Sequence, residues 1–106
     1  MPVRLYPQGE AKVIETLTKD LSLGGFKCLS PTAKPVATPM AVELDLGPGA
    51  HALDLRAQIV WFEDVPQSDQ FYLGLVFNEL NDKTRQLLSR YLERLSAPRT
   101  HLRTTS

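Results

Sequence analysis

Hydrophobic and polar residues alternate along most of the first eighty positions of the chain. Every second side chain of a β-strand points to the same face, so this alternation predicts strands that each have one buried face. The clearest strand places Met40, Val42, Leu44 and Leu46 on its buried side. The predicted strands are Val3–Tyr6, Lys12–Thr18, Phe26–Leu29, Met40–Leu46, Ala52–Phe62 and Phe71–Phe77.

Glycine and proline residues separate these strands. The segment from Pro31 to Pro39 contains three prolines and is predicted as a loop, because proline cannot donate a hydrogen bond inside a central strand. Gly74 interrupts the last strand, where a glycine often marks a bend or bulge. Six short strands joined by such turns predict an all-β fold, an antiparallel barrel or sandwich. In the fifth strand one face is predicted to hold Leu53, Leu55, Ala57, Ile59 and Trp61.

The period changes after residue 80. Asn81 is a predicted helix N-cap, and an apolar stripe at helical spacing follows it. The stripe consists of Leu87, Leu88, Tyr91, Leu92 and Leu95. We expect this helix to span about residues 82–96 and to end before Pro98, which leaves residues 98–106 as a flexible polar tail. Residues 1–97 then form one domain.

Charge is unevenly distributed over a chain of 106 residues whose formal net charge is zero. Residues 1–80 carry a net charge of −4 and the residues from Asn81 onward carry +4. The helix is predicted to present Lys83, Arg85, Arg90 and Arg94 on its outward face. Such a face is either an ordinary solvated surface or the contact surface for an anionic protein partner.

Several classes of protein are disfavoured by the composition. Cys28 is the only cysteine, and the pattern around it predicts a small buried hydrophobic residue rather than a nucleophile. His51 and His101 have no second ligand at metal spacing, and no catalytic or cofactor motif is present, so we expect no metal, no cofactor and no enzyme activity. No apolar run approaches the ~20 residues that span a bilayer, and the first residues do not resemble a signal peptide. We therefore expect a cytoplasmic protein.

One short motif concentrates polar residues and glycines. Asp20, Ser22 and Gly25 form the spacing D-x-S-x-x-G between two predicted strands. These residue types also serve ordinary turns, because Asp and Ser bond to nearby backbone and glycine adopts positive φ. The motif is therefore either a turn chosen for its shape or part of a binding site.

The order of these segments resembles the PilZ family over about residues 2–95. The segments Ile59-Val60-Trp61 and Tyr72 to Phe77 are similar to later strands of that family, and the turn matches its D-x-S-x-x-G motif. PilZ domains are bacterial receptors for cyclic di-GMP (c-di-GMP) and have a six-stranded antiparallel β-barrel. The resemblance implies an all-β barrel of PilZ type with one C-terminal helix and c-di-GMP as the ligand. The implied ligand-binding residues are Asp20, Ser22 and Gly25, with Arg4 and Gly24 as further candidates.

The sequence departs from the family in one respect. PilZ domains carry an R-x-x-x-R motif just before the first strand, whose arginines bind phosphate and guanine. Here Arg4 stands alone and Gln8 occupies the second position, so we expect the motif-bearing part of the chain to lack the cations that a dinucleotide needs. The chain is then either a piece of a longer protein or a form without the arginines, and as it stands should bind c-di-GMP weakly or not at all.

Two other functions compete with c-di-GMP binding. A PilZ-like adaptor would contact a protein through the basic helix face without any nucleotide. Binding to DNA or RNA is disfavoured, because Trp61 and Phe71 are expected on apolar faces instead of interleaving with basic residues.

Overall fold

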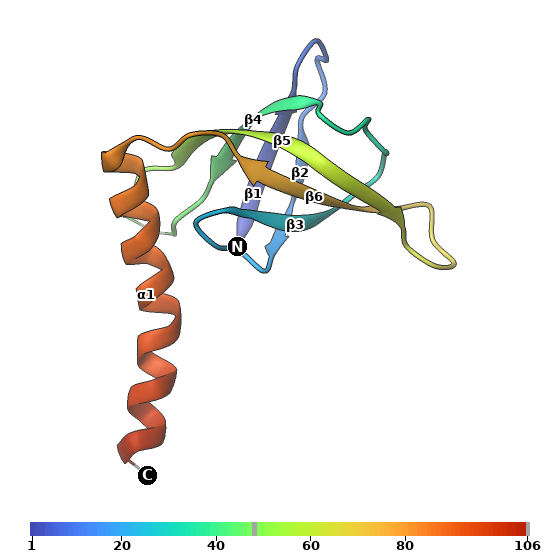
Figure 1. The fold of residues 1–106 in the computed structure, drawn as a ribbon. Helices are drawn as coiled ribbons and strands as arrows, with labels where there is room; N and C mark the ends of the chain where they lie inside the picture. The colour runs from blue at the N-terminus through green and yellow to red at the C-terminus, as the bar shows by residue number, and fades with distance from the viewer. Residues whose placement is uncertain (48, 106) are drawn as a thin grey trace.

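A closed barrel of six antiparallel strands with one C-terminal helix forms the computed structural model of the protein (Figure 1). The structure describes the backbone of residues 1–47 and 49–105 and the side chains of residues 1–47 and 49–94. The strands follow one another around the barrel in the order β1-β2-β3-β6-β5-β4. The predicted all-β barrel with a terminal helix is confirmed. The elements are β1 (Pro2–Pro7), β2 (Ile14–Lys19), β3 (Gly25–Ser30), β4 (Pro39–Leu44), β5 (Leu53–Asp64), β6 (Phe71–Phe77) and α1 (Asp82–Thr105).

The core fills the inside of the barrel with the inward-facing side chains of all six strands. Met40, Val42 and Leu44 of β4 are buried as the alternation predicts, whereas Leu46 lies past the end of the strand and is only partly buried. Opposite them, Leu53, Leu55, Ala57 and Ile59 of β5 and Leu73, Leu75 and Phe77 of β6 are also buried. Because each strand contributes alternate residues to one core, the outer faces of the strands remain available for binding.

Trp61 is the main error in the predicted core. The pairing of β5 with β6 shifts register between Ile59 and Trp61, which is a β-bulge at Val60. A bulge inserts one extra residue and so reverses which side chains face inward. Trp61 is therefore 40% exposed on the outer face of the barrel instead of buried with Ile59. It lies opposite Gly74, which the sequence marks as a point of irregularity.

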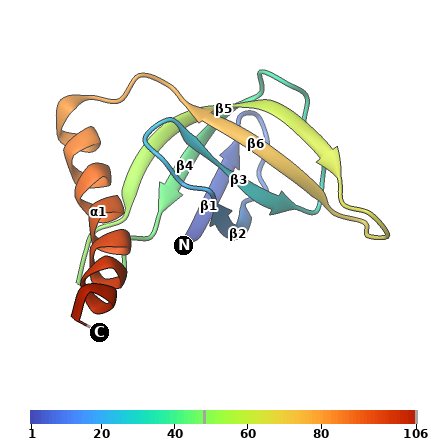
Figure 2. The same cartoon turned by 60° about the horizontal axis from the view of Figure 1, so that its bottom comes forward.

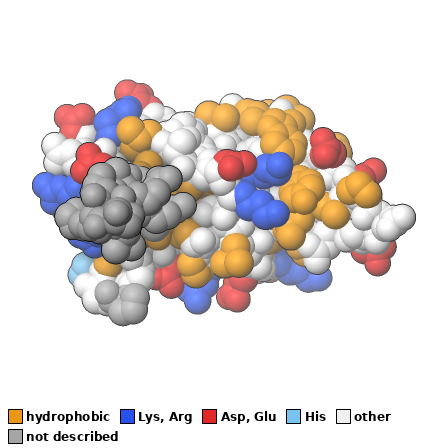
Figure 3. Space-filling model, turned by 90° about the horizontal axis from the view of Figure 1, so that it is seen from below, with side chains coloured by type: hydrophobic (Ala, Val, Ile, Leu, Met, Phe, Trp, Pro, Cys, Tyr) orange, Lys and Arg blue, Asp and Glu red, His pale blue; other side chains and the backbone are white. Residues whose placement is uncertain are grey.

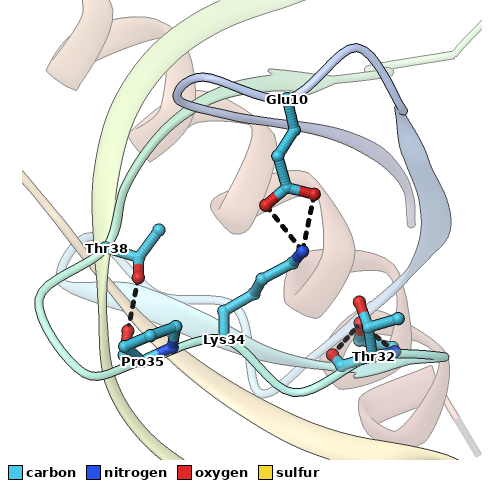
Figure 4. A network of polar contacts seen from close by, with 6 residues as sticks. Glu10, Thr32, Lys34, Pro35 and Thr38 are labelled. Atoms are coloured by element: carbon cyan, nitrogen blue, oxygen red, sulfur yellow. Dashed lines mark hydrogen bonds and ion pairs between the residues drawn. The ribbon is translucent and has the colours of Figure 1, made fainter.

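One end of the barrel is crossed by an ion pair (Figure 4). The Lys34 Nζ atom donates to both carboxylate oxygens of Glu10, at 2.7 and 2.6 Å. This contact joins the turn between β1 and β2 to the loop between β3 and β4, the proline-containing segment that the sequence predicts as a loop. Only 14% of the Lys34 side chain is exposed, so the carboxylate of Glu10 compensates a largely buried charge.

Helix α1 begins where the sequence predicts. Asn81 caps it, because its side-chain oxygen accepts a hydrogen bond from the Thr84 N–H at 2.7 Å. Leu88 is fully buried against the barrel, whereas Leu87 is 38% exposed. The predicted apolar stripe of the helix is therefore wider than the helix surface that contacts the barrel. The reason is that the helix axis points away from the barrel (Figures 1 and 2).

The predicted end of this helix is wrong. Helix α1 continues through Pro98 to Thr105. A proline inside a helix removes one backbone donor and can kink the helix, but it does not always end it. The flexibility expected of residues 98–106 stays a prediction. In the part of the chain that the structure describes, no helix has both the length and the hydropathy needed to cross a membrane.

Candidate functional site

The D-x-S-x-x-G motif forms the connection between β2 and β3. The Ser22 hydroxyl oxygen accepts a hydrogen bond from the Gly24 N–H at 3.1 Å, and the Ser22 N–H donates to the Gly25 carbonyl oxygen at 2.9 Å. Asp20 has a φ of +53°, in the left-handed region that aspartate tolerates better than most residues. Part of the motif therefore serves the shape of the turn, as one of the two sequence interpretations proposes.

Gly25 has a structural reason to be glycine. A Cβ atom at this position would lie 2.0 Å from the Leu75 carbonyl oxygen and 3.0 Å from the Cα atom of Val76. Both atoms belong to the backbone of β6, with which β3 pairs at this point. Glycine is thus required for the close approach of two strands, and Gly25 is buried beneath the surface of the motif. Gly24 has open surroundings, since the nearest atom to its added Cβ is the Ser22 Oγ at 3.7 Å.

A shallow groove of about 430 Å³ runs along the outer face of the barrel beside the motif. Its volume lies within the roughly 300–1,000 Å³ of small-molecule sites. Asp20, Ser22, Gly24 and Gly25 line one side. The other lining residues come from β3, β5 and β6 and are Phe26, Lys27, Val60, Trp61, Gly74, Leu75 and Val76. The structure therefore places four of the five predicted ligand-binding residues in one groove.

The indole of Trp61 forms an aromatic part of this groove. It lies directly against the backbone of Gly74, where an added Cβ would be 2.2 Å from the indole Cε2 and 2.3 Å from Nε1. Only a glycine at position 74 leaves room for the indole to approach the strand this closely. The bulge in β5 thus turns Trp61 outward, and Gly74 leaves the space in which its indole packs against β6.

Two lysines lie beside the same groove, which the sequence analysis missed. The Lys27 Nζ is 5.9 Å from the centre of the Trp61 ring and 4.7 Å from that of Tyr72, and the Lys19 Nζ is 5.3 Å from that of Tyr72. All three distances are within the range of cation–π contacts. The motif-bearing part thus has two lysines beside the groove, and the expectation that it lacks the cations a dinucleotide needs stays a prediction. Because Lys27 lies between the buried residues Phe26 and Cys28, the alternation in the sequence predicts that it faces outward. The register of β2 with β3, which brings Lys19 next to Lys27, could not be predicted from the sequence.

A family model described as "PilZ domain" matches residues 1–94 of the chain. The chain belongs to the PilZ family. The resemblance stated from the sequence is thus confirmed, and the barrel and helix agree with this assignment. No curated protein matches the sequence.

Solved structures similar to this PilZ domain share its fold. The PilZ domain of YcgR from Escherichia coli, solved with c-di-GMP, has a TM-score of 0.72 at 18% identity, and the match covers 99% of this chain and 88% of that one. The motility inhibitor MotI/DgrA of Bacillus subtilis has a TM-score of 0.73 at 18% identity over 92% of this chain. A tetrameric PilZ protein of Xanthomonas campestris, assembled through a helical bundle, has a TM-score of 0.68 at 26% identity over 89% of this chain. The chain spans about half the length of the last two, 46% and 51%.

Arg4 is not part of the groove in this PilZ domain. It lines a separate depression of about 300 Å³ together with Glu15 and Glu43. Its guanidinium contacts Glu43 at 3.0 Å and Glu15 at 3.4 Å across the neighbouring strands. The hydrogen bond to Glu43, together with the charges of both glutamates, raises the pKa of Arg4. The structure therefore does not bring Arg4 together with Asp20 and Ser22.

The remaining candidate groups lie away from the groove or are inaccessible. Cys28 is fully buried as predicted, and burial raises the pKa of its thiol to about 12. A neutral buried thiol is a poor nucleophile. Across residues 1–47 and 49–94, no three His, Cys, Asp or Glu side chains gather as they would around a metal ion. The predicted basic residues of the helix, Lys83, Arg85, Arg90 and Arg94, are all exposed on α1.

Proposed function

We propose that this PilZ domain is a c-di-GMP receptor domain and that the groove beside Asp20 binds one guanine of the ligand. The observation that carries the proposal is that Asp20, Ser22 and Trp61 line one open groove on the outer face of the barrel. The family assignment supports it, as does the shared fold with the YcgR domain that was solved with c-di-GMP. The domain acts by binding and has no catalytic role in this proposal.

The chemistry of the groove suits guanine. Within the described part of the chain, no hydrogen bond or ion pair holds the Asp20 carboxylate, and its side chain is exposed. A carboxylate accepts two hydrogen bonds, and the Watson–Crick edge of guanine offers two neighbouring donors, the N1–H and the exocyclic amine. Adenine has no donor at N1 and cannot make this pair of bonds. The exposed indole of Trp61 offers an apolar surface for the face of a base.

The test is calorimetric titration of the chain with c-di-GMP and, separately, with cyclic di-AMP. We expect saturable heat with c-di-GMP and none with cyclic di-AMP. Asp20→Asn is the matched variant, because asparagine also tolerates the positive φ at this position. Losing a charged acceptor costs about 1.5–3 kcal/mol, so the affinity should fall at least tenfold.

Asp69→Asn serves as the control, since Asp69 is an exposed carboxylate in the turn between β5 and β6, outside the groove. It should bind c-di-GMP as the unaltered chain does. Equal affinity for the two cyclic dinucleotides, or an Asp20→Asn variant that binds like the control, contradicts the proposal.

A second candidate function is protein contact through α1 without nucleotide. It is favoured by the exposure of Lys83, Arg85, Arg90 and Arg94 on the helix and by Gln8, which stands where an R-x-x-x-R motif beginning at Arg4 would have its second arginine. If this function holds, the double variant Arg90→Glu, Arg94→Glu loses activity in cells whereas Asp20→Asn retains it. The reverse pattern supports the receptor function.

A further inference from the structure

Two lysines face each other across neighbouring strands at the edge of the groove. Lys19 of β2 and Lys27 of β3 are direct partners in the strand register. Like charges opposite each other on paired strands destabilise a sheet. Over residues 1–47 and 49–94, neither ammonium is paired with a carboxylate. The barrel therefore carries an uncompensated pair of positive charges at this point.

Two other cations of the barrel are neutralised by carboxylates. Arg4 contacts Glu15 and Glu43, and Lys34 contacts Glu10. Lys19 and Lys27 have aromatic partners instead, since both ammonium groups lie over the ring of Tyr72. An aromatic face attracts a cation and orients it but adds no negative charge. Both charges thus remain available to an anion.

The surroundings of this pair are those of a ligand site. Lys27 is half-buried and lines the same groove as Asp20 and Ser22. Figure 3 shows a face of the barrel on which blue Lys and Arg side chains lie directly against orange hydrophobic side chains. Two adjacent ammonium groups offer up to six N–H donors, whereas a phosphodiester offers two anionic oxygens that accept them.

We propose that Lys19 and Lys27 form a phosphate-binding site at the edge of the groove. This inference rests on the proposed function, because it assigns the phosphate of a dinucleotide whose guanine lies at Asp20. A bound phosphodiester relieves the repulsion between the lysines and forms charge-assisted hydrogen bonds with them. The lysines then contribute to binding and disfavour the unbound barrel.

This dual effect gives the proposal a distinctive test. Lys27→Gln and Lys19→Gln are compared with Lys12→Gln, a control at an exposed lysine before β2 that is outside the groove. Each groove variant should bind c-di-GMP about tenfold more weakly, which corresponds to one charge-assisted hydrogen bond. Without ligand, each should melt at the same temperature as the unaltered chain or higher. The control should match the unaltered chain in both measurements.

A second probe separates this inference from the guanine site. Inorganic pyrophosphate presents phosphate without a base, and it should raise the melting temperature of the unaltered chain and of Asp20→Asn but not of Lys27→Gln. Binding of c-di-GMP that is unchanged in both lysine variants overturns the phosphate assignment and leaves the proposed function standing. A pyrophosphate effect without any c-di-GMP binding contradicts the proposed function and shows only that the two lysines bind an anion. Melting temperatures that fall in both lysine variants show that the lysines are structural and overturn the inference.

Discussion

Replacing Gly25 with alanine tests the close contact between β3 and β6. The added methyl group would lie 2.0 Å from the Leu75 carbonyl oxygen and 3.0 Å from the Cα atom of Val76, so the strands must separate by on the order of 1 Å. The neighbouring hydrogen bond from the Phe77 N–H to the Gly24 oxygen, at 2.8 Å, lengthens with this movement. Overpacking costs about 1–3 kcal/mol and each weakened hydrogen bond up to about 1 kcal/mol.

The expected loss in the free energy of unfolding is therefore about 2–4 kcal/mol. For a domain of this size each kcal/mol shifts the melting temperature by about 4–8 °C, so Gly25→Ala should melt at least roughly 8 °C lower. Gly24→Ala is the matched control, because its Cβ would meet only the Ser22 Oγ at 3.7 Å and its φ is not positive. It should leave the stability unchanged or raise it by about 0.4–1 kcal/mol. Thermal and urea unfolding measure both variants, and equal stability of the two refutes the reasoning.

Two further predictions concern the core and the end of the barrel. Glu10→Gln should destabilise the fold by about 1–3 kcal/mol, because it leaves the largely buried Lys34 ammonium without its carboxylate. Lys34→Met should cost less, since Glu10 is partly exposed and can be hydrated; urea titrations that rank the two variants the other way contradict this account. Cys28 should react with thiol reagents at pH 8 only after unfolding, because its pKa is raised to about 12 in the fold. Rapid labelling of the native protein at pH 8 contradicts this expectation. Since the pKa of the thiol is near 9 in the unfolded chain, the contribution of the buried thiol to stability should be lost as the pH rises from about 9 towards 12.

The sequence predicts the barrel well because hydrophobic and polar residues alternate over much of its strands. Met40, Val42 and Leu44 are buried as predicted, since a strand with one core face leaves little choice of register. The same rule fails at Trp61, because the bulge at Val60 reverses the alternation and depends on pairing with a distant strand. The prediction of the helix end is also wrong, because it rests on Pro98 alone. Proline is a strong local signal for a helix to stop, but α1 continues through it.

The site shows the same division between local and long-range information. Asp20, Ser22 and Gly25 lie close together in the chain, so a short motif is enough to mark them as candidates. Lys19 and Lys27 become neighbours only through the register of β2 with β3, which the sequence does not reveal. Arg4 is a candidate ligand-binding residue in the sequence because it is the one arginine near the N-terminus. In the fold, glutamates on both neighbouring strands hold it in a depression separate from the groove.

An NMR titration of the isotope-labelled chain with c-di-GMP tests the central claim most directly, because it detects weak binding and locates it. We expect saturable shifts in the backbone amides of residues 19–27 and in the Trp61 indole N–H, and no such shifts with cyclic di-AMP. The indole signal is well placed to report on the groove, since Trp61 lines it beside Lys27. Spectra that stay unchanged at millimolar c-di-GMP, or shifts confined to α1, contradict the claim.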